Sequence, residues 1–253
     1  MVHDGPTRDM VVTMRKSILW IVVSLAFGIT PAWAGGNLIG SLAGSIGGAA
    51  GFVDNFDGTT LDNTTYSYDN VDAASSIVQG SGVVVLTSGA NAGKTQIVYR
   101  TAITKTAHTY KVDAKSNMNG GSGGAYQLRV EEQAALPSLA THDDAKYLIF
   151  GGISPGNRSS IYYKPPSDID TEAAAVLSLA SDTYYRLRLD TTTTFWRYRI
   201  MSVDEETTHA DSGERLWSNT RNNSTNLWLI IAEEPYSTAN TAPTITITRF
   251  EVQ

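Results

Sequence analysis

The chain has 253 residues, of which 42% are hydrophobic and 17% are charged, and its formal net charge is −6. This apolar content is enough for a sizeable core, and the low charge excludes a globally disordered chain. The negative net charge and the lack of a basic run disfavour binding to nucleic acid or to an anionic membrane surface. Cysteine is absent, which excludes disulfides, thiolate catalysis and cysteine-ligated metals.

Residues 1–34 have the three parts of a secretory signal peptide in order. These parts are the basic start Met14-Arg15-Lys16, the apolar run Ile18–Ile29, and the small-residue site Ala32-Trp33-Ala34. The apolar run is shorter than the ~20 residues that span a bilayer, so a signal peptide is favoured over an N-terminal membrane anchor. We predict cleavage after Ala34 and favour Met14 as the translation start. The mature protein is expected to be secreted, extracellular or periplasmic, with no membrane span.

Residues 35–51 form a segment rich in Gly, Ala and Ser. Glycine at this density stabilises neither helix nor strand, which predicts a flexible arm. An alternative is self-association, in which the extended arm adds to the sheet edge of a neighbouring molecule. Leu38, Leu42 and Ile46 would then fill pockets in that neighbour.

Residues 52–253 show one uniform pattern with no linker, which predicts a single domain. Short runs of Val, Ile, Thr, Tyr and Trp alternate with turn residues, as in all-β proteins. The predicted strands are Ile77–Val78, Val83–Thr87, Thr95–Ile103, Thr109–Ala114, Ala125–Glu131, Lys146–Phe150, Ser160–Lys164, Ala174–Leu179, Tyr184–Asp190, Phe195–Val203, Leu227–Ala232 and Thr244–Val252. The best helix candidate is Thr171–Ala180, but its many short residues do not decide between helix and strand.

Strict alternation of apolar and polar residues is clearest in Tyr126–Glu131, Tyr184–Asp190 and Phe195–Ile200. This period of two indicates antiparallel strands with one buried and one wet face. The last two segments flank Thr191–Thr194 and predict a hairpin. A dozen such strands favour an all-β, two-sheet antiparallel sandwich.

Three segments resemble one superfamily. Asn55–Asp62 resembles the "FDGTxLD" opening of concanavalin A-like lectin/glucanase domains, Tyr184–Asp190 is similar to their "YRLRID" strand, and Ile245–Val252 resembles their closing strand. In the closing strand the inward-facing residues are Ile245 and Ile247 at first, and then Phe250 and Val252. This shift by one position predicts a bulge near Thr248-Arg249. The resemblance covers residues 52–253 and implies a jelly-roll sandwich with a concave face that often holds carbohydrate.

Retaining glycosidases of the superfamily that this chain resembles typically carry carboxylates at alternate positions of one strand, in an E-x-D-x-x-E or E-x-D-x-E pattern. The nearest match, Asp204 and Glu206, is truncated and precedes a polar turn, so solvated hairpin carboxylates are favoured over a catalytic pair. Polysaccharide lyases on this fold use Arg, Gln or Asn, His and Tyr. The chain offers the corresponding residues Gln96, Arg100, His108, Tyr110, Gln127, Arg129, Tyr162 and Lys164, but in no lyase signature.

A binding face is therefore the leading hypothesis. Its predicted carbohydrate-binding residues are Tyr184, Arg186, Arg188, Arg197 and Arg199, joined by Gln127 and Arg129 if their strand lies in the same sheet. Tyr rings stack on sugars, and Arg donates in-plane hydrogen bonds or pairs with a carboxylate or sulfate. The alternative is an ordinary solvated sheet face on which the arginines pair with Glu131, Asp190 or Glu205.

Asp54, Asn55 and Asp57 offer oxygen ligands in one loop, as a Ca²⁺ site requires. Turn capping is the alternative role for the same residues. No other cofactor is expected. The sequence thus predicts a secreted, non-catalytic carbohydrate-binding domain. Two alternatives stay open: a structural subunit of an extracellular assembly that uses the arm, and a divergent glycoside hydrolase or polysaccharide lyase.

Overall fold

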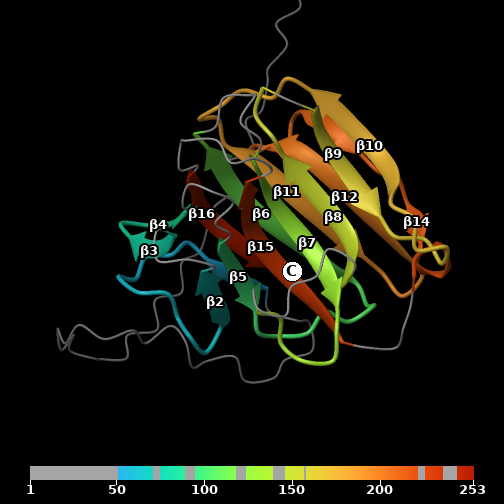
Figure 1. Ribbon diagram of the computed structural model, residues 1–253, viewed down its shortest axis with the longest axis horizontal. Coiled ribbons are helices and arrows are strands. Elements are labelled where there is room, and N and C mark those ends of the chain that lie inside the picture. Colours follow the sequence, from blue (N-terminus) through green and yellow to red (C-terminus); the bar gives the residue numbers. More distant parts are fainter. Residues whose placement is uncertain are drawn as a thin grey trace, which may run out of the picture. The chain divides into compact units, whose positions relative to one another are not determined.

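The structure is a computed structural model (Figure 1), and it describes residues 51–70, 75–88, 95–117, 124–138, 146–156, 158–221, 226–235 and 244–253. The predicted signal peptide, residues 1–34, and nearly all of the predicted arm, residues 35–51, lie outside these ranges. Both therefore stay predictions. Among the residues that the structure describes, no helix has the length and hydropathy needed to cross a bilayer.

The described residues form two antiparallel sheets. Sheet A has nine strands. Its main path, in spatial order, is β13 (Thr208–Asp211), β12 (Phe195–Ser202), β11 (Tyr185–Thr191), β6 (His108–Ser116), β16 (Thr244–Val252), β4 (Val83–Thr87) and β3 (Ser76–Gly80). Two short strands lie off this path: β1 (Phe52–Asp54) pairs with β16, and β14 (Arg215–Leu216) pairs with β12.

Sheet B has seven strands. In spatial order they are β10 (Thr171–Leu177), β9 (Arg158–Tyr163), β8 (Tyr147–Ile153), β7 (Gly124–Glu132), β15 (Leu227–Pro235), β5 (Thr95–Tyr99) and β2 (Tyr66–Asn70). In Figure 1, β8 and β9 lie over β11 and β12, so the two sheets face each other.

The core lies between the sheets, where the inward residues of each alternating strand meet. Leu187 and Leu189 of sheet A and Leu128 and Val130 of sheet B all belong to one buried cluster. Tyr198 of β12 also joins the layers, because its hydroxyl donates to the carbonyl oxygen of Leu128 at 2.9 Å. This buried hydrogen bond satisfies a polar group that would otherwise be costly to bury.

The predicted fold class and the alternation are confirmed. The predicted hairpin forms between β11 and β12. The register of β16 shifts between Ile247 and Arg249, at the predicted bulge. The undecided segment Thr171–Ala180 forms strand β10 rather than a helix. In the described part of the chain, the named helical element is a single 3-10 turn, Trp217–Asn219.

Candidate functional site

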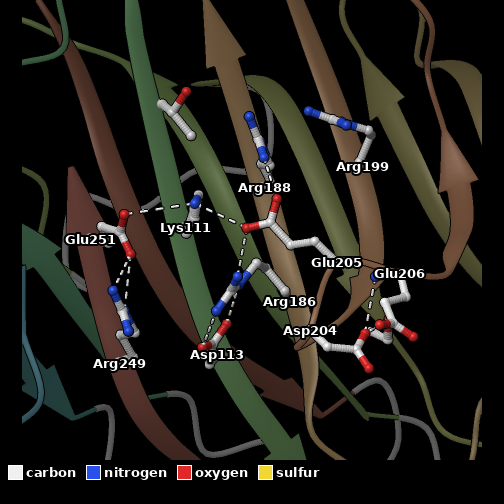
Figure 2. Close-up of polar contacts among 12 residues, drawn as sticks. Lys111, Asp113, Arg186, Arg188, Arg199, Asp204, Glu205, Glu206, Arg249 and Glu251 are labelled. Carbon is white, nitrogen blue, oxygen red and sulfur yellow. Dashed lines mark hydrogen bonds and ion pairs between the residues drawn. The ribbon is translucent and has the colours of Figure 1, made fainter. Parts of the chain in front are cut away.

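The outer face of sheet A carries the predicted arginines. Because Tyr185, Leu187 and Leu189 point into the core, Arg186, Arg188 and Asp190 of β11 point outward. The outward residues of the neighbouring strands lie beside them. These are Lys111 and Asp113 of β6, Arg199 of β12, and Arg249 and Glu251 of β16 (Figure 2), together with Arg197 of β12.

Each arginine on this face has a carboxylate partner. Arg186 binds Asp113 through two nitrogens, Nε at 2.7 Å and Nη2 at 2.6 Å. The remaining ion pairs are Arg188 and Arg199 with Asp190, Arg197 with Asp211, and both Lys111 and Arg249 with Glu251. We call this set, together with Glu205, the ion lattice of sheet A.

Glu205 is the one member of the ion lattice that no strand carries. It lies in the loop between β12 and β13 and reaches back over the sheet. Its carboxylate accepts from Lys111 Nζ at 2.9 Å and from Arg186 Nη1 at 2.6 Å, and it also accepts from Arg188 Nη1. Partial burial raises the pKa of Glu205, but the bonds from Lys111 and Arg186 and the charge of Arg188 outweigh it and hold the pKa at about 2.

These contacts match the alternative reading of the arginine face, in which Asp190 and Glu205 pair with the arginines. A ligand at this face meets guanidinium groups that already have partners. Tyr184 precedes β11 and lies beside Lys115, whose Nζ is 5.3 Å from the centre of its ring. Gln127 and Arg129 were expected on this face only if their strand joined the same sheet. Both lie on β7, which belongs to sheet B. Sheet membership depends on pairing between distant segments, which alternation within one strand does not specify.

The outer face of sheet B changes character from one edge of the sheet to the other. One cross-strand row contains Val98, Ile230, Arg129, Phe150, Tyr162 and Glu172, in that order. Near its start, Ala102 and Leu136 pack on an apolar cluster that includes Val98 and Ile230. Arg129 is buried in the middle of the row, where its Nε lies 2.9 Å from Glu131. The accessible part of the row is therefore formed by β8, β9 and β10.

Phe150 and Tyr162 of this row are half-buried, as is Tyr147, which lies beside Phe150 on β8, and we call these three side chains the aromatic ridge. Their ring centres are 5.9 Å apart between Tyr147 and Phe150, and 6.2 Å apart between Phe150 and Tyr162. The rings are tilted by 49° and 40°, so they form a stepped surface rather than a closed stack. Such half-buried rings offer apolar faces at a fixed position.

The two tyrosines of the aromatic ridge each have a carboxylate neighbour. Interaction with Tyr147 helps to lower the pKa of Asp170, and interaction with Tyr162 helps to lower that of Glu172. Each carboxylate also has a cationic partner. Lys164 Nζ lies 2.5 Å from Asp170 and 4.5 Å from the centre of the Tyr147 ring.

The second cationic partner is Arg158, which binds Glu172 through Nε at 3.2 Å and through a second nitrogen. This contact is the main cause that lowers the pKa of Glu172 and keeps its carboxylate ionised. The two ion pairs therefore balance the charges beside the aromatic ridge.

Sequence reasoning missed Tyr147 and Phe150 as site residues because a bulge hides their relationship. Residues three apart point to opposite faces of a regular strand. Here the pairing of β7 with β8 shifts between Val130 and Glu131, so that Leu148 and Ile149 both reach the core. The bulge returns Tyr147 to the outer face beside Phe150. No pattern in the sequence of β8 marks this extra residue.

The structure does not assemble a catalytic set from the candidates. Asp204 and Glu206 are exposed in the loop after β12, and Asp204 accepts from the Ser202 hydroxyl and from the Glu206 N–H. The favoured reading of them as solvated hairpin carboxylates fits this position. Of the lyase-type residues, the outer face of sheet B collects Gln96, Gln127, Arg129, Tyr162 and Lys164. The first three are buried and Lys164 is ion-paired with Asp170, so this group is not arranged around an open reaction site.

Of the predicted Ca²⁺ ligands, Asp54 has both carboxylate oxygens in hydrogen bonds. Asp54 Oδ1 accepts from the Phe56 N–H at 2.7 Å, and Oδ2 accepts from the Tyr66 hydroxyl at 3.0 Å. These donors point their hydrogens at the oxygens that a cation would need, and the first bond holds Phe56 at a φ of 56°. Within the described ranges, His, Asp and Glu side chains do not gather in threes in a way that could hold a metal ion. Turn capping is the role that the contacts support.

The two facing antiparallel sheets and their strand order define a concanavalin A-like jelly-roll sandwich, as the sequence resemblance implied. No protein-family model matches the sequence, and no curated protein matches it. Solved structures do match. The carbohydrate recognition domain of Emp46p in its potassium-bound form is 10% identical, with a TM-score of 0.57 over 79% of this chain and 94% of that chain.

Two further matches have the same fold. The exoplasmic/lumenal domain of VIP36 in its Ca²⁺-bound form is 12% identical, with a TM-score of 0.56 over 80% of this chain and 88% of that one. A glycosyl hydrolase family protein from Mycobacterium fortuitum is 10% identical, with a TM-score of 0.51 over 80% of this chain and 98% of that one. At these identities the likeness establishes the fold alone.

Proposed function

We propose that this protein is a secreted, non-catalytic carbohydrate-binding domain that holds a glycan on the aromatic ridge of sheet B. The observation that carries the proposal is the series of three half-buried rings, Tyr147, Phe150 and Tyr162, next to the ion pairs Lys164–Asp170 and Arg158–Glu172. Amphipathic rings held rigidly lose little conformational entropy when a ligand stacks on them.

The surroundings of the aromatic ridge favour an uncharged sugar. The apolar face of a pyranose stacks on an aromatic ring, while its hydroxyls need hydrogen-bond acceptors at the rim. Asp170 and Glu172 provide such acceptors beside Tyr147 and Tyr162. Because Lys164 and Arg158 balance their charges, the ridge does not attract an acidic glycan over a neutral one.

The fold neighbours support a glycan as the ligand class. The carbohydrate recognition domain of Emp46p is among them, and VIP36 appears in Ca²⁺/Man-bound and Ca²⁺/Man3GlcNAc-bound forms. The contacts of Asp204 support the non-catalytic part of the proposal, because its carboxylate caps the exposed hairpin loop by accepting from the Ser202 hydroxyl and the Glu206 N–H.

A glycan array on the purified protein tests the proposal, followed by calorimetry on any hit. We expect Tyr162→Ala and Phe150→Ala to weaken binding by about tenfold or more each, because each removes a stacking surface. Tyr68→Ala is the matched control, since Tyr68 is an exposed tyrosine at the far edge of sheet B. It should leave binding unchanged.

Two results would count against the aromatic ridge. Silence across neutral and acidic glycans would remove the carbohydrate-binding function. Loss of binding of a neutral glycan in Arg188→Ala or Arg197→Ala, with full binding of that glycan in Tyr162→Ala, would instead move the neutral-sugar site to the arginine face of sheet A.

A further inference from the structure

Three cations of the ion lattice donate to one point above sheet A. Arg186 Nη1, Arg188 Nη1 and Lys111 Nζ all bind the carboxylate of Glu205 (Figure 2). Each of the three also has a carboxylate partner of its own on a strand, namely Asp113 for Arg186, Asp190 for Arg188 and Glu251 for Lys111. The donors would therefore keep their positions if Glu205 left.

The charges of this region leave room for an anion. Lys111, Arg188 and Arg199 lie directly opposite one another across β6, β11 and β12. Like charges in such a row repel, so an anion is needed between each pair of neighbouring cations. Asp190 lies between Arg188 and Arg199, and Glu205 lies between Lys111 and Arg188. Without Glu205, no carboxylate would lie between Lys111 and Arg188.

Glu205 occupies its position under local backbone strain. Its N–H donates to the Ser202 carbonyl, and the Ser202 N–H donates to the Thr207 carbonyl, which closes a tight hairpin loop. The φ of Glu205 is 64°, a left-handed conformation that glycine adopts freely and that is unfavourable for a residue with a side chain. Its side chain is also the most exposed of the four, at 25% against 10–22% for the three cations.

We propose that Arg186, Arg188 and Lys111 form a binding site for a carboxylate or sulfate group of an acidic saccharide, and that Glu205 occupies this site as an internal substitute in the free protein. Two guanidinium groups and one ammonium match the oxygens of such a group. The ligand displaces Glu205, and the loop relaxes. The site lies on sheet A and does not depend on the aromatic ridge of sheet B.

The test compares the full chain with the variants Glu205→Gln and Glu205→Gly, the second of which suits the left-handed backbone. Calorimetry at constant ionic strength uses three probes: sodium sulfate, glucuronate and a sulfated disaccharide. We expect both variants to bind the two saccharides at least about tenfold more tightly than the wild type. Adding Arg188→Ala to Glu205→Gln should abolish this gain.

Glu206→Gln is the matched control, because it removes the same charge from the same loop and Glu206 is exposed. Its affinities should equal those of the wild type. An equal gain in Glu206→Gln would mean a general effect of net charge and would overturn the proposal. So would binding of sulfate without either saccharide, unchanged affinities in folded Glu205 variants, or failure of both variants to fold, since a displaceable group cannot be required for folding.

Discussion

Lys111 on β6 lies directly opposite Arg188 on β11, although both side chains are cationic. The register of two strands fixes this arrangement, because the inward residues on either side belong to the core and cannot shift by one position. The loop residue Glu205 lies between the two cations and binds both. The stability of this part of sheet A thus depends on a carboxylate supplied from outside the strands.

The first prediction concerns that dependence. We expect Glu205→Gln to lower the free energy of unfolding by about 1–3 kcal/mol, because it leaves Lys111 and Arg188 facing each other with less compensation. Lys111→Met should recover part of this loss when added to Glu205→Gln, although by itself it destabilises the protein. Urea unfolding of the four proteins gives the coupling energy. A coupling near zero would show that the two cations do not interact through Glu205.

The second prediction is a pH dependence. The pKa of Glu205 is about 2 in the folded protein, against an ordinary value of 4.5. A carboxyl with a depressed pKa adds stability that is present above its unfolded value and is lost as the pH falls from there through the folded value. The difference in unfolding free energy between wild type and Glu205→Gln should therefore shrink between about pH 5 and about pH 2. If this free-energy difference stayed constant across the range, the carboxylate of Glu205 would not be stabilised by ion pairs in the folded protein.

Much of the fold was predictable because its central strands alternate strictly. Tyr126–Val130 and Tyr185–Leu189 place large apolar residues at every second position, and only a sandwich core accepts them. The edge strand β2 (Tyr66–Asn70) was not predicted. Its sequence, Tyr-Ser-Tyr-Asp-Asn, has two aromatic residues on one side and polar residues at its end. An edge strand pairs on one side only, so it can form without the long apolar alternation of a central strand.

Less of the candidate site could be predicted. The arginines of β11 and β12 were found because they alternate with core residues, and the alternative interpretation named Asp190 and Glu205 among their partners. The sequence did not show that Glu205 binds three cations at once, because the path of its loop over the sheet is a tertiary feature. Arg129 has the same local pattern as Arg188 and lies in the other sheet, since strand order is set by pairing between distant segments.

The third prediction concerns the loop that was expected to hold Ca²⁺. Asp54→Ala removes the acceptor for the Phe56 N–H and for the Tyr66 hydroxyl, and we expect a loss of about 1 kcal/mol in unfolding free energy. The loss should be the same with added Ca²⁺ and with a chelator, because hydrogen-bond donors already point at both oxygens. Thermal unfolding in the two conditions measures this. A rise in wild-type melting temperature with Ca²⁺ that Asp54→Ala abolishes would restore the metal site.

The last prediction concerns the contact between the two sheets at Gly151 of β8. A Cβ added at this residue would lie 2.2 Å from the Cε1 and Cζ atoms of the Tyr198 ring, far inside contact distance. Tyr198 is fully buried and its hydroxyl is bonded to Leu128, so the ring has no free space to move into. We expect Gly151→Ala to destabilise the protein by about 3 kcal/mol or more, through overpacking and loss of the inter-sheet bond.

Gly80→Ala is the control for this substitution, because no atom lies within 4 Å of the Cβ that it would add. It should change the unfolding free energy by less than about 0.5 kcal/mol. Tyr198→Leu, which removes the clashing ring, should cost less in the Gly151→Ala background than in the wild type. Urea unfolding measures all three. A tolerated Gly151→Ala would mean that the two sheets are not held at the separation that places Tyr198 against β8.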